Sequence, residues 1–185
     1  MNKVMKKLLL PLLIIFAMQM NAQKYFTKTG SISFLSKAPL ETIEGNNKSV
    51  ACLLESKSGA IDFIVQIKSF VFDKQLLQEH FNENYMESEK FPKATFKGRI
   101  VNMSSINLTK DGEYDAKAEG KLTIHGVTHD VNFMGKISVK AGKINLRSDA
   151  SVLLADYNIA IPGAVKDKIS KDVKIKVNCT LELLH

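Results

Sequence analysis

The chain of 185 residues contains no tryptophan, two cysteines and four prolines. Two cysteines allow at most one intramolecular disulfide, and no suitable partners flank either one for a metal site or a catalytic pair. No serine stands in a nucleophile elbow, and no glycine-rich phosphate loop precedes a helix. Because no nucleophile, base and orienting group can be assembled, the sequence does not indicate an enzyme, a cofactor or a metal site.

Only one long apolar run is present, from Leu8 to Met18. It follows three lysines and ends shortly before Ala22, which is the order of charge, apolar segment and small residue found in a secretory signal peptide. The run is shorter than the ~20 residues of a membrane-spanning helix. We therefore expect residues 1–22 to be removed and residues 23–185 to be periplasmic or secreted. An uncleaved membrane anchor is the alternative.

Acidic residues are outnumbered, with 19 Asp and Glu against 26 Lys and Arg. The formal net charge of +7 falls to +4 without the three lysines of the expected signal peptide. This mild positive charge is compatible with transient contact with an anionic membrane surface, but it does not mark nucleic-acid binding. The lysines are spread over many predicted strands, which is typical of a solvent-exposed outer face.

The stretch from Asp115 to Lys140 has the clearest pattern in the chain. Two runs of alternating small or apolar and polar residues are joined by His125 to His129, a short connection that contains a glycine. Because side chains alternate between the faces of a strand, this pattern predicts a β-hairpin with one dry face. The dry positions are Ala116, Ala118, Gly120, Leu122 and Ile124 in the first run and Val131, Phe133, Gly135, Ile137 and Val139 in the second.

Strand-like segments recur along the rest of the chain, without an internal repeat or a domain linker. We expect strands near residues 25–36, 40–45, 50–55, 61–67, 93–100, 144–154 and 173–183, with a turn at residues 46–48 and an irregular segment at 156–171. One helix is expected from Asp73 to Tyr85, capped by Asp73 and with Leu77, Phe81 and Tyr85 on its inward stripe. His80 is expected to be partly buried beside that stripe.

About eight amphipathic strands must each hide one face, which a sandwich or a closed barrel achieves. Several predicted strands are about ten residues long, and this length suits the tilted strands of a barrel. The sequence therefore predicts an all-β fold, an antiparallel eight-stranded barrel with one α-helix inserted near residues 73–85.

Small residues and aromatics share the predicted inner face of this barrel. The small residues leave volume that forms either an apolar cavity or the gaps that the aromatic rings fill in a packed core. For a cavity, we predict a lining of Phe34, Phe63, Phe96, Ala116, Ala118, Gly120, Leu122, Phe133, Ala150, Val152 and Tyr157. Tyr157 would either hydrogen-bond the head group of a ligand at the barrel mouth or cap the core.

Three stretches resemble the YceI-like family. Gly120–Thr128 reads G-K-L-T-I-H-G-V-T and is very similar to the G-x-L-T-I-x-G-V-T hairpin of that family. His80–Tyr85 with Phe91–Phe96 resembles its helix and the Y/F-P-x-x-x-F start of the following strand, and Asp172–Leu183 looks like its closing strand. The resemblance covers nearly all of residues 23–185. It implies an exported, lipocalin-like barrel of one domain that binds a polyisoprenoid, a fatty acid or a similar lipid without catalysis.

Two departures from the family pattern concern the ligand more than the fold. Asp130 stands where many members place proline after the hairpin turn, and Asp149–Lys171 lacks the usual phenylalanine-rich approach to the last strand. Two other interpretations stay open. A packed barrel would serve as a structural or partner-binding module, and an outer-membrane barrel would need an apolar outer band and aromatic girdles.

The remaining candidate residues have plain structural interpretations. His125 and His129 are four apart, as in some helical metal pairs, but here they straddle a turn without a third ligand, so we expect two exposed turn histidines. Cys179 is in phase with its apolar neighbours on a dry face, and we favour buried free thiols for Cys52 and Cys179, with a disulfide as the alternative. The sequence leaves the oligomeric state open.

Overall fold

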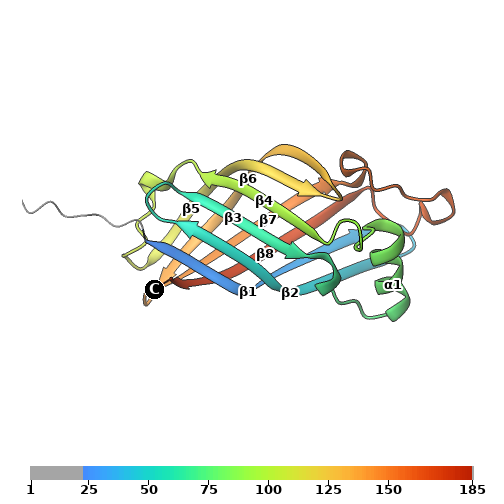
Figure 1. Cartoon of the computed structure of the whole chain (residues 1–185), viewed down its shortest axis with the longest axis horizontal. Coiled ribbons are helices and arrows are strands. Elements are labelled where there is room, and N and C mark those ends of the chain that lie inside the picture. Colours follow the sequence, from blue (N-terminus) through green and yellow to red (C-terminus); the bar gives the residue numbers. More distant parts are fainter. Residues whose placement is uncertain (1–22, 185) are drawn as a thin grey trace, which may run out of the picture.

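The structure, a computed structural model, describes residues 23–184 and forms a closed antiparallel barrel of eight strands (Figure 1). Each strand pairs with the next one in the chain, and β8 closes the barrel on β1. The strands are β1 (Lys24–Lys37), β2 (Thr42–Glu55), β3 (Ala60–Gln66), β4 (Lys93–Ile100), β5 (Gly112–Ile124), β6 (Val127–Lys140), β7 (Lys143–Leu153) and β8 (Asp172–Leu183). The predicted fold is confirmed, whereas the expected signal peptide lies outside the described residues.

Short helical segments connect some of the strands. They are α1 (Gln75–His80), which continues into a π-helical turn, η2 (Phe81–Tyr85), and the 3₁₀ turns η1 (Ile67–Ser69), η3 (Met103–Ser105), η4 (Leu154–Tyr157) and η5 (Gly163–Val165). Within residues 23–184, no helix has the length and apolar character needed to cross a membrane. The segments that carry α1 and η4 lie at the same end of the barrel, and we call this end the helix end (Figure 1).

The predicted helix is present but begins two residues later than expected. Lys74 precedes its first turn, and no side chain caps that turn, so the expected cap by Asp73 is wrong. Leu77, Phe81 and Tyr85 are half-buried, as their spacing predicted, whereas His80 is exposed. Packing against the barrel, rather than a local capping signal, holds this short helix in place.

The β5–β6 hairpin turns more tightly than its sequence suggested. His125 and Gly126 form a two-residue turn with φ values of 51° and 76°, the left-handed conformation that such hairpins require. The residues from Val127 to His129, which we expected in the connection, therefore belong to β6.

The turn predicted at residues 46–48 is wrong, because β2 continues through it as a single strand. The β1–β2 pairing moves from Ile32↔Asn47 to Gly30↔Val50, which places an extra residue in β2. The buried Asn47 side chain stabilises this bulge: its Nδ2 donates to the Gln66 carbonyl at 2.9 Å and its Oδ1 accepts from the Ser49 amide at 2.8 Å. An asparagine that looked like a turn residue thus satisfies backbone groups inside the sheet.

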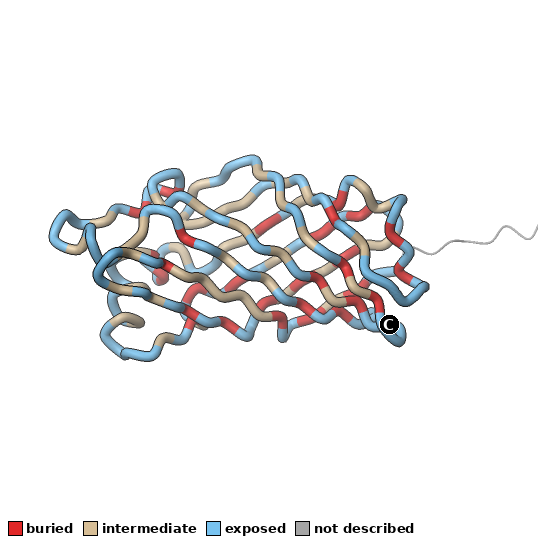
Figure 2. Tube along the Cα trace, turned by 180° about the vertical axis from the view of Figure 1, so that it is seen from behind, coloured by how far each residue is buried: buried red, intermediate tan, exposed pale blue. Residues whose placement is uncertain are grey.

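The apolar core fills the end of the barrel that lies opposite the helix end, and we call it the packed end. Figure 2 shows buried residues gathered toward the end that carries the C-terminus, with half-buried residues along the middle. Leu54, Ile137, Ile144 and Leu181 are at most 1% exposed there. The loop between β4 and β5 adds Ile106 and Leu108 to the same core.

The packing of β4 against β5 depends on two glycines, Gly98 and Gly120, which are paired across the strands. A Cβ atom on Gly120 would lie 2.4 Å from the Lys97 carbonyl oxygen and 2.5 Å from the Gly98 Cα. Both distances are far below van der Waals contact, so the two backbones meet where neither residue has a side chain.

Candidate ligand-binding cavity

An apolar cavity of about 550 Å³ lies inside the barrel, between the packed end and the helix end. Its volume falls within the ~300–1,000 Å³ range of small-molecule sites. The sequence-predicted residues that line it are Phe34 on β1, Phe63 on β3, Phe96 on β4, Ala116, Ala118 and Leu122 on β5, Phe133 on β6, Ala150 and Val152 on β7, and Tyr157 in η4. Gly120 is the exception, because it lies against Gly98 in the strand contact and does not line the cavity.

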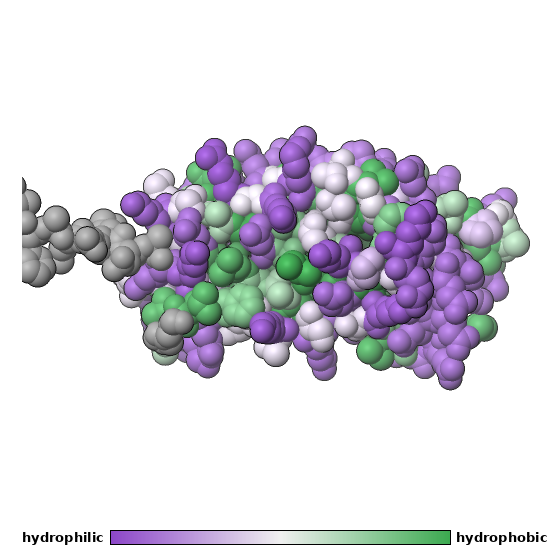
Figure 3. Space-filling model, in the orientation of Figure 1, coloured by the Kyte–Doolittle hydropathy of each residue, from purple (hydrophilic) through white to green (hydrophobic). Residues whose placement is uncertain are grey.

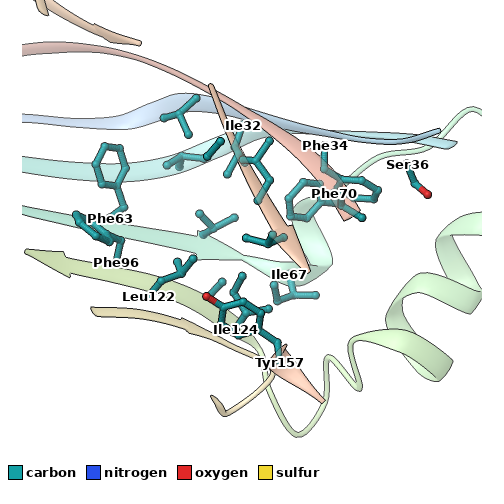
Figure 4. A pocket seen from close by; sticks show the side chains of 18 of the residues that line it. Ile32, Phe34, Ser36, Phe63, Ile67, Phe70, Phe96, Leu122, Ile124 and Tyr157 are labelled. Carbon is teal, nitrogen blue, oxygen red and sulfur yellow. The ribbon is translucent and has the colours of Figure 1, made fainter. Parts of the chain in front are cut away.

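Three phenylalanines, on β3, β4 and β6, project into the cavity. The Phe63 and Phe96 rings are 6.4 Å apart, and the Phe96 and Phe133 rings are 5.6 Å apart, both pairs tilted. Figure 4 shows Phe63 and Phe96 at the side of the cavity away from the helix. The aromatic rings therefore occupy part of the interior without filling it, because Ala118 and Ala150 still line an open volume, and this is the choice that the sequence alone could not decide.

A second aromatic cluster attaches the helix to the barrel mouth. The Phe81 ring stacks on Phe34 with centroids 5.4 Å apart and also contacts Phe70 and Phe72 at 5.4 and 5.0 Å. Phe70 and Phe72 line the cavity but were missed by sequence reasoning. The available signal was the Phe70-Val71-Phe72 run between the third strand and the helix, which alternation alone did not place on either element.

The two hairpin histidines hold η4 over the other side of the mouth. His125 Nδ1 lies 3.1 Å from the Tyr157 carbonyl oxygen, and His129 Nε2 lies 2.8 Å from the Asp156 carbonyl oxygen. Since a carbonyl only accepts, each of these ring nitrogens carries the hydrogen. His125 also packs edge-on to Phe91, and only 9% of its side chain is exposed, so the expectation that both histidines are exposed is wrong for His125.

The histidines are thus used in hydrogen bonds to separate carbonyls. Residues 23–184 contain no group of three His, Cys, Asp or Glu side chains that could hold a metal ion. The sequence motif at the hairpin therefore has a structural role in this fold, that of positioning Tyr157.

The Tyr157 side chain presents a polar atom to the apolar cavity. The residue is 3% exposed, and Figure 4 shows its hydroxyl directed toward the interior. Burial, with a smaller contribution from the Asp156 carboxylate, raises the pKa of this hydroxyl above its ordinary value. The group therefore stays protonated at neutral pH and can donate a hydrogen bond to an oxygen atom in the cavity.

Charged and apolar residues border the cavity at the helix end. Lys74 Nζ lies 3.7 Å from Glu41 Oε1 across the mouth, and both residues line the cavity, as do Leu76 and Lys168. Leu76 is 59% exposed, so the apolar lining continues to the surface at this end. The arrangement can enclose an apolar chain in the barrel and leave a polar end near the rim.

A closed antiparallel barrel that keeps an apolar cavity between a packed end and a helix-covered end belongs to the lipocalin-like class of folds. The model of the YceI-like domain matches residues 19–181. The chain therefore belongs to the YceI-like domain family, as its hairpin motif suggested.

Solved structures share the fold at low sequence identity. A polyisoprenoid binding domain from Saccharophagus degradans, implicated in plant cell wall breakdown, is 12% identical with a TM-score of 0.76, over 88% of this chain and 99% of that one. BcnA from Burkholderia cenocepacia is 18% identical with a TM-score of 0.67, over 82% and 95%. A YCEI protein from Campylobacter jejuni is 20% identical with a TM-score of 0.57, over 76% and 84%. A comparison with curated proteins gives no match.

Proposed function

We propose that the protein is an exported carrier that holds a long apolar molecule, such as a polyisoprenoid or a fatty acid, inside the barrel without changing it chemically. The observation that carries this proposal is the apolar cavity of about 550 Å³ beneath the helix end. Each CH₂ group that leaves water for such an interior contributes about 0.8 kcal/mol. Membership of the family and the fold shared with a polyisoprenoid binding domain support the same ligand class.

The outer face favours this carrier over an outer-membrane barrel. Outward positions in the middle of β4 and β5 are charged and exposed, as at Lys97, Glu119 and Lys121, where a membrane barrel needs an apolar band. Figure 3 shows one face of the barrel covered largely by hydrophilic side chains, with smaller apolar patches between them. The cavity, in turn, favours a carrier over a packed structural module.

Native mass spectrometry tests the proposal directly. Protein purified under mild conditions from cells that export it is expected to carry a lipid, and emptied protein is expected to take up an isoprenoid or a fatty acid.

Tyr157→Phe removes the one hydroxyl that we place against the ligand, and should weaken binding of an oxygen-bearing lipid by about fivefold, the equivalent of ~1 kcal/mol. A pure hydrocarbon of the same length, which accepts no hydrogen bond, is the control and should bind both proteins equally. A protein that stays empty when offered both lipid types would contradict the carrier function.

We also propose that the helix end contacts a membrane surface when the ligand is exchanged. Three apolar side chains are exposed around it: Leu40 at 72%, Val71 at 61% and Leu76 at 59%. Leu40 and the loop that carries Lys168 are joined by a hydrogen bond of 3.0 Å from the Leu40 amide to the Asp167 carbonyl. The hydrogen bond therefore places the exposed Leu40 side chain beside the loop that carries Lys168. An apolar side chain next to a positive charge suits an anionic lipid surface.

Sedimentation with vesicles that contain an anionic phospholipid measures this contact. Leu76→Asp is expected to lower the bound fraction at least threefold, because it removes an apolar contact and adds a negative charge at the helix end. Leu184→Asp is the matched control, since Leu184 is 51% exposed at the opposite end of the barrel. Equal binding of the two variants would exclude the helix end as the contact surface.

A further inference from the structure

A bulge in β1 shifts the pairing register of this strand with both of its neighbours. The pairing of β1 with β2 shifts between Thr27 and Gly30, and its pairing with β8 shifts between Phe26 and Ser31. Lys28 and the residue after it are exposed in this interval, whereas Gly30 is buried. The extra length of β1 is therefore accommodated on the outside of the barrel.

Under this bulge, β2 and β8 come close to each other although neither is the hydrogen-bonded neighbour of the other. Cα atoms of the two strands approach within 8 Å. Cys52 on β2 and Cys179 on β8 point inward at this place and are 1% and 0% exposed, and each thiol is close enough to the other to shift its pKa. The two buried free thiols agree with the sequence prediction, but their contact could not be read from a spacing of more than one hundred residues.

Gly30 provides the space in which the Cys179 sulfur lies beneath β1. A Cβ atom at this position would lie 2.4 Å from Cys179 Sγ and 3.1 Å from the Val50 carbonyl oxygen. The absence of a side chain on the intervening strand thus lets the Cys179 side chain lie beneath β1, on the side that faces β2.

We propose that Cys52 and Cys179 form a disulfide bond when the protein folds in an oxidising compartment, joining β2 to β8 across β1. Each thiol loses its hydrogen and one S–S bond forms, while a disulfide oxidant, such as glutathione disulfide or the active-site disulfide of a thiol oxidase, is reduced to two thiols. A disulfide requires Cα atoms about 4.4–6.8 Å apart, so bond formation fixes the separation of β2 and β8 beneath the bulge.

The bond forms during folding rather than afterwards. Both sulfurs are enclosed by the core, and the Cys179 sulfur, followed by burial, raises the pKa of the Cys52 thiol above its ordinary value. Thiol exchange proceeds through an accessible thiolate, which the folded barrel does not offer at Cys52. Neither cysteine lines the cavity, so the bond constrains the barrel without changing the ligand site.

Refolding in a mixture of reduced and oxidised glutathione tests the proposal with the whole chain. The refolded protein is expected to be a monomer lighter by two hydrogen atoms, with no thiol that reacts after denaturation. Reduction with dithiothreitol in denaturant, followed by refolding in the same reductant, should then lower the thermal midpoint by about 10 °C, because the bond closes a loop of more than one hundred residues.

Two single variants provide the controls. Cys52→Ser and Cys179→Ser should each keep one free thiol and lose the response of the midpoint to dithiothreitol. Should either variant fail to fold, the mass and thiol count of the unchanged protein still show whether the disulfide has formed. Two reactive thiols per monomer after refolding, or mixed disulfides with glutathione in place of the internal bond, would overturn the proposal.

Discussion

Ala118→Phe is expected to abolish lipid retention while the barrel stays folded. The Ala118 side chain lines the cavity on β5, opposite Phe133 on β6 and beside Ile100 on β4. A phenyl ring there occupies the space that a ligand chain would fill. Displacing about four CH₂ groups costs about 3 kcal/mol of binding, so the affinity should fall by roughly 100-fold. Native mass spectrometry of the purified variant, followed by titration with the same lipid, measures the loss.

The matched control is Ala51→Phe, which adds the same ring outside the cavity. Ala51 lies on β2 between the inward-facing Val50 and Cys52, pairs with the exposed Ile64 and does not line the cavity. This variant should keep its lipid. A folded Ala118→Phe protein that binds lipid as well as the unchanged chain would show that the ligand does not occupy the middle of the barrel.

Alanine at Gly98 or Gly120 is expected to destabilise the barrel by about 1–3 kcal/mol, with a thermal midpoint lower by roughly 3–10 °C. A Cβ atom on Gly98 would lie 2.3 Å from the Glu119 carbonyl oxygen, and one on Gly120 would meet the backbone of β4 equally closely. Backbone atoms cannot move aside as flexible side chains do, so β4 and β5 would have to separate. Calorimetry or thermal unfolding followed by circular dichroism measures the effect.

Gly163→Ala supplies the control for these substitutions. Nothing lies within 4 Å of the position of a Cβ at Gly163, so alanine there should leave the midpoint unchanged or slightly higher. The effects of Gly98→Ala and Gly120→Ala should not add in the double variant, because both force apart the same pair of strands. An unchanged midpoint in either single variant would mean that the close approach of β4 and β5 is not required.

The contrast between Ala118 and Gly120 shows how much of the cavity lining could be predicted from the sequence. Both occupy dry positions two residues apart, and alternation correctly places both on the inner face of β5. Alternation assigns a face, but it carries no information about depth along the barrel or about the residue on the neighbouring strand. The role of Gly120 depends on its pairing with Gly98, which is fixed only when the strands close into a barrel. A large side chain at Gly120 would therefore disrupt the sheet rather than fill the cavity.

The same limit explains the errors at Asn47 and Asp73. Asparagine is common in turns, yet the Asn47 side chain donates a hydrogen bond to the Gln66 carbonyl of β3, which is near it only in the folded barrel. Aspartate is a favoured helix cap, yet no side chain caps this helix, and its position follows from the packing of Phe81 against Phe34. The hairpin and the closing strand were predictable because their signals are local. The aromatic cluster at the barrel mouth was not predictable, because its members come from three separate segments of the chain.

The division between a packed end and a hollow end has a consequence for how such a barrel can evolve. Most of the fully buried side chains, Leu54 and Ile144 among them, lie away from the cavity. Exchange of a residue such as Ala150 or Val152 alters the shape offered to a guest molecule without touching those side chains. New guests can therefore be accommodated by substitutions near the helix, while the opposite half preserves the scaffold, which is consistent with one architecture persisting among sequences that are 12–20% identical.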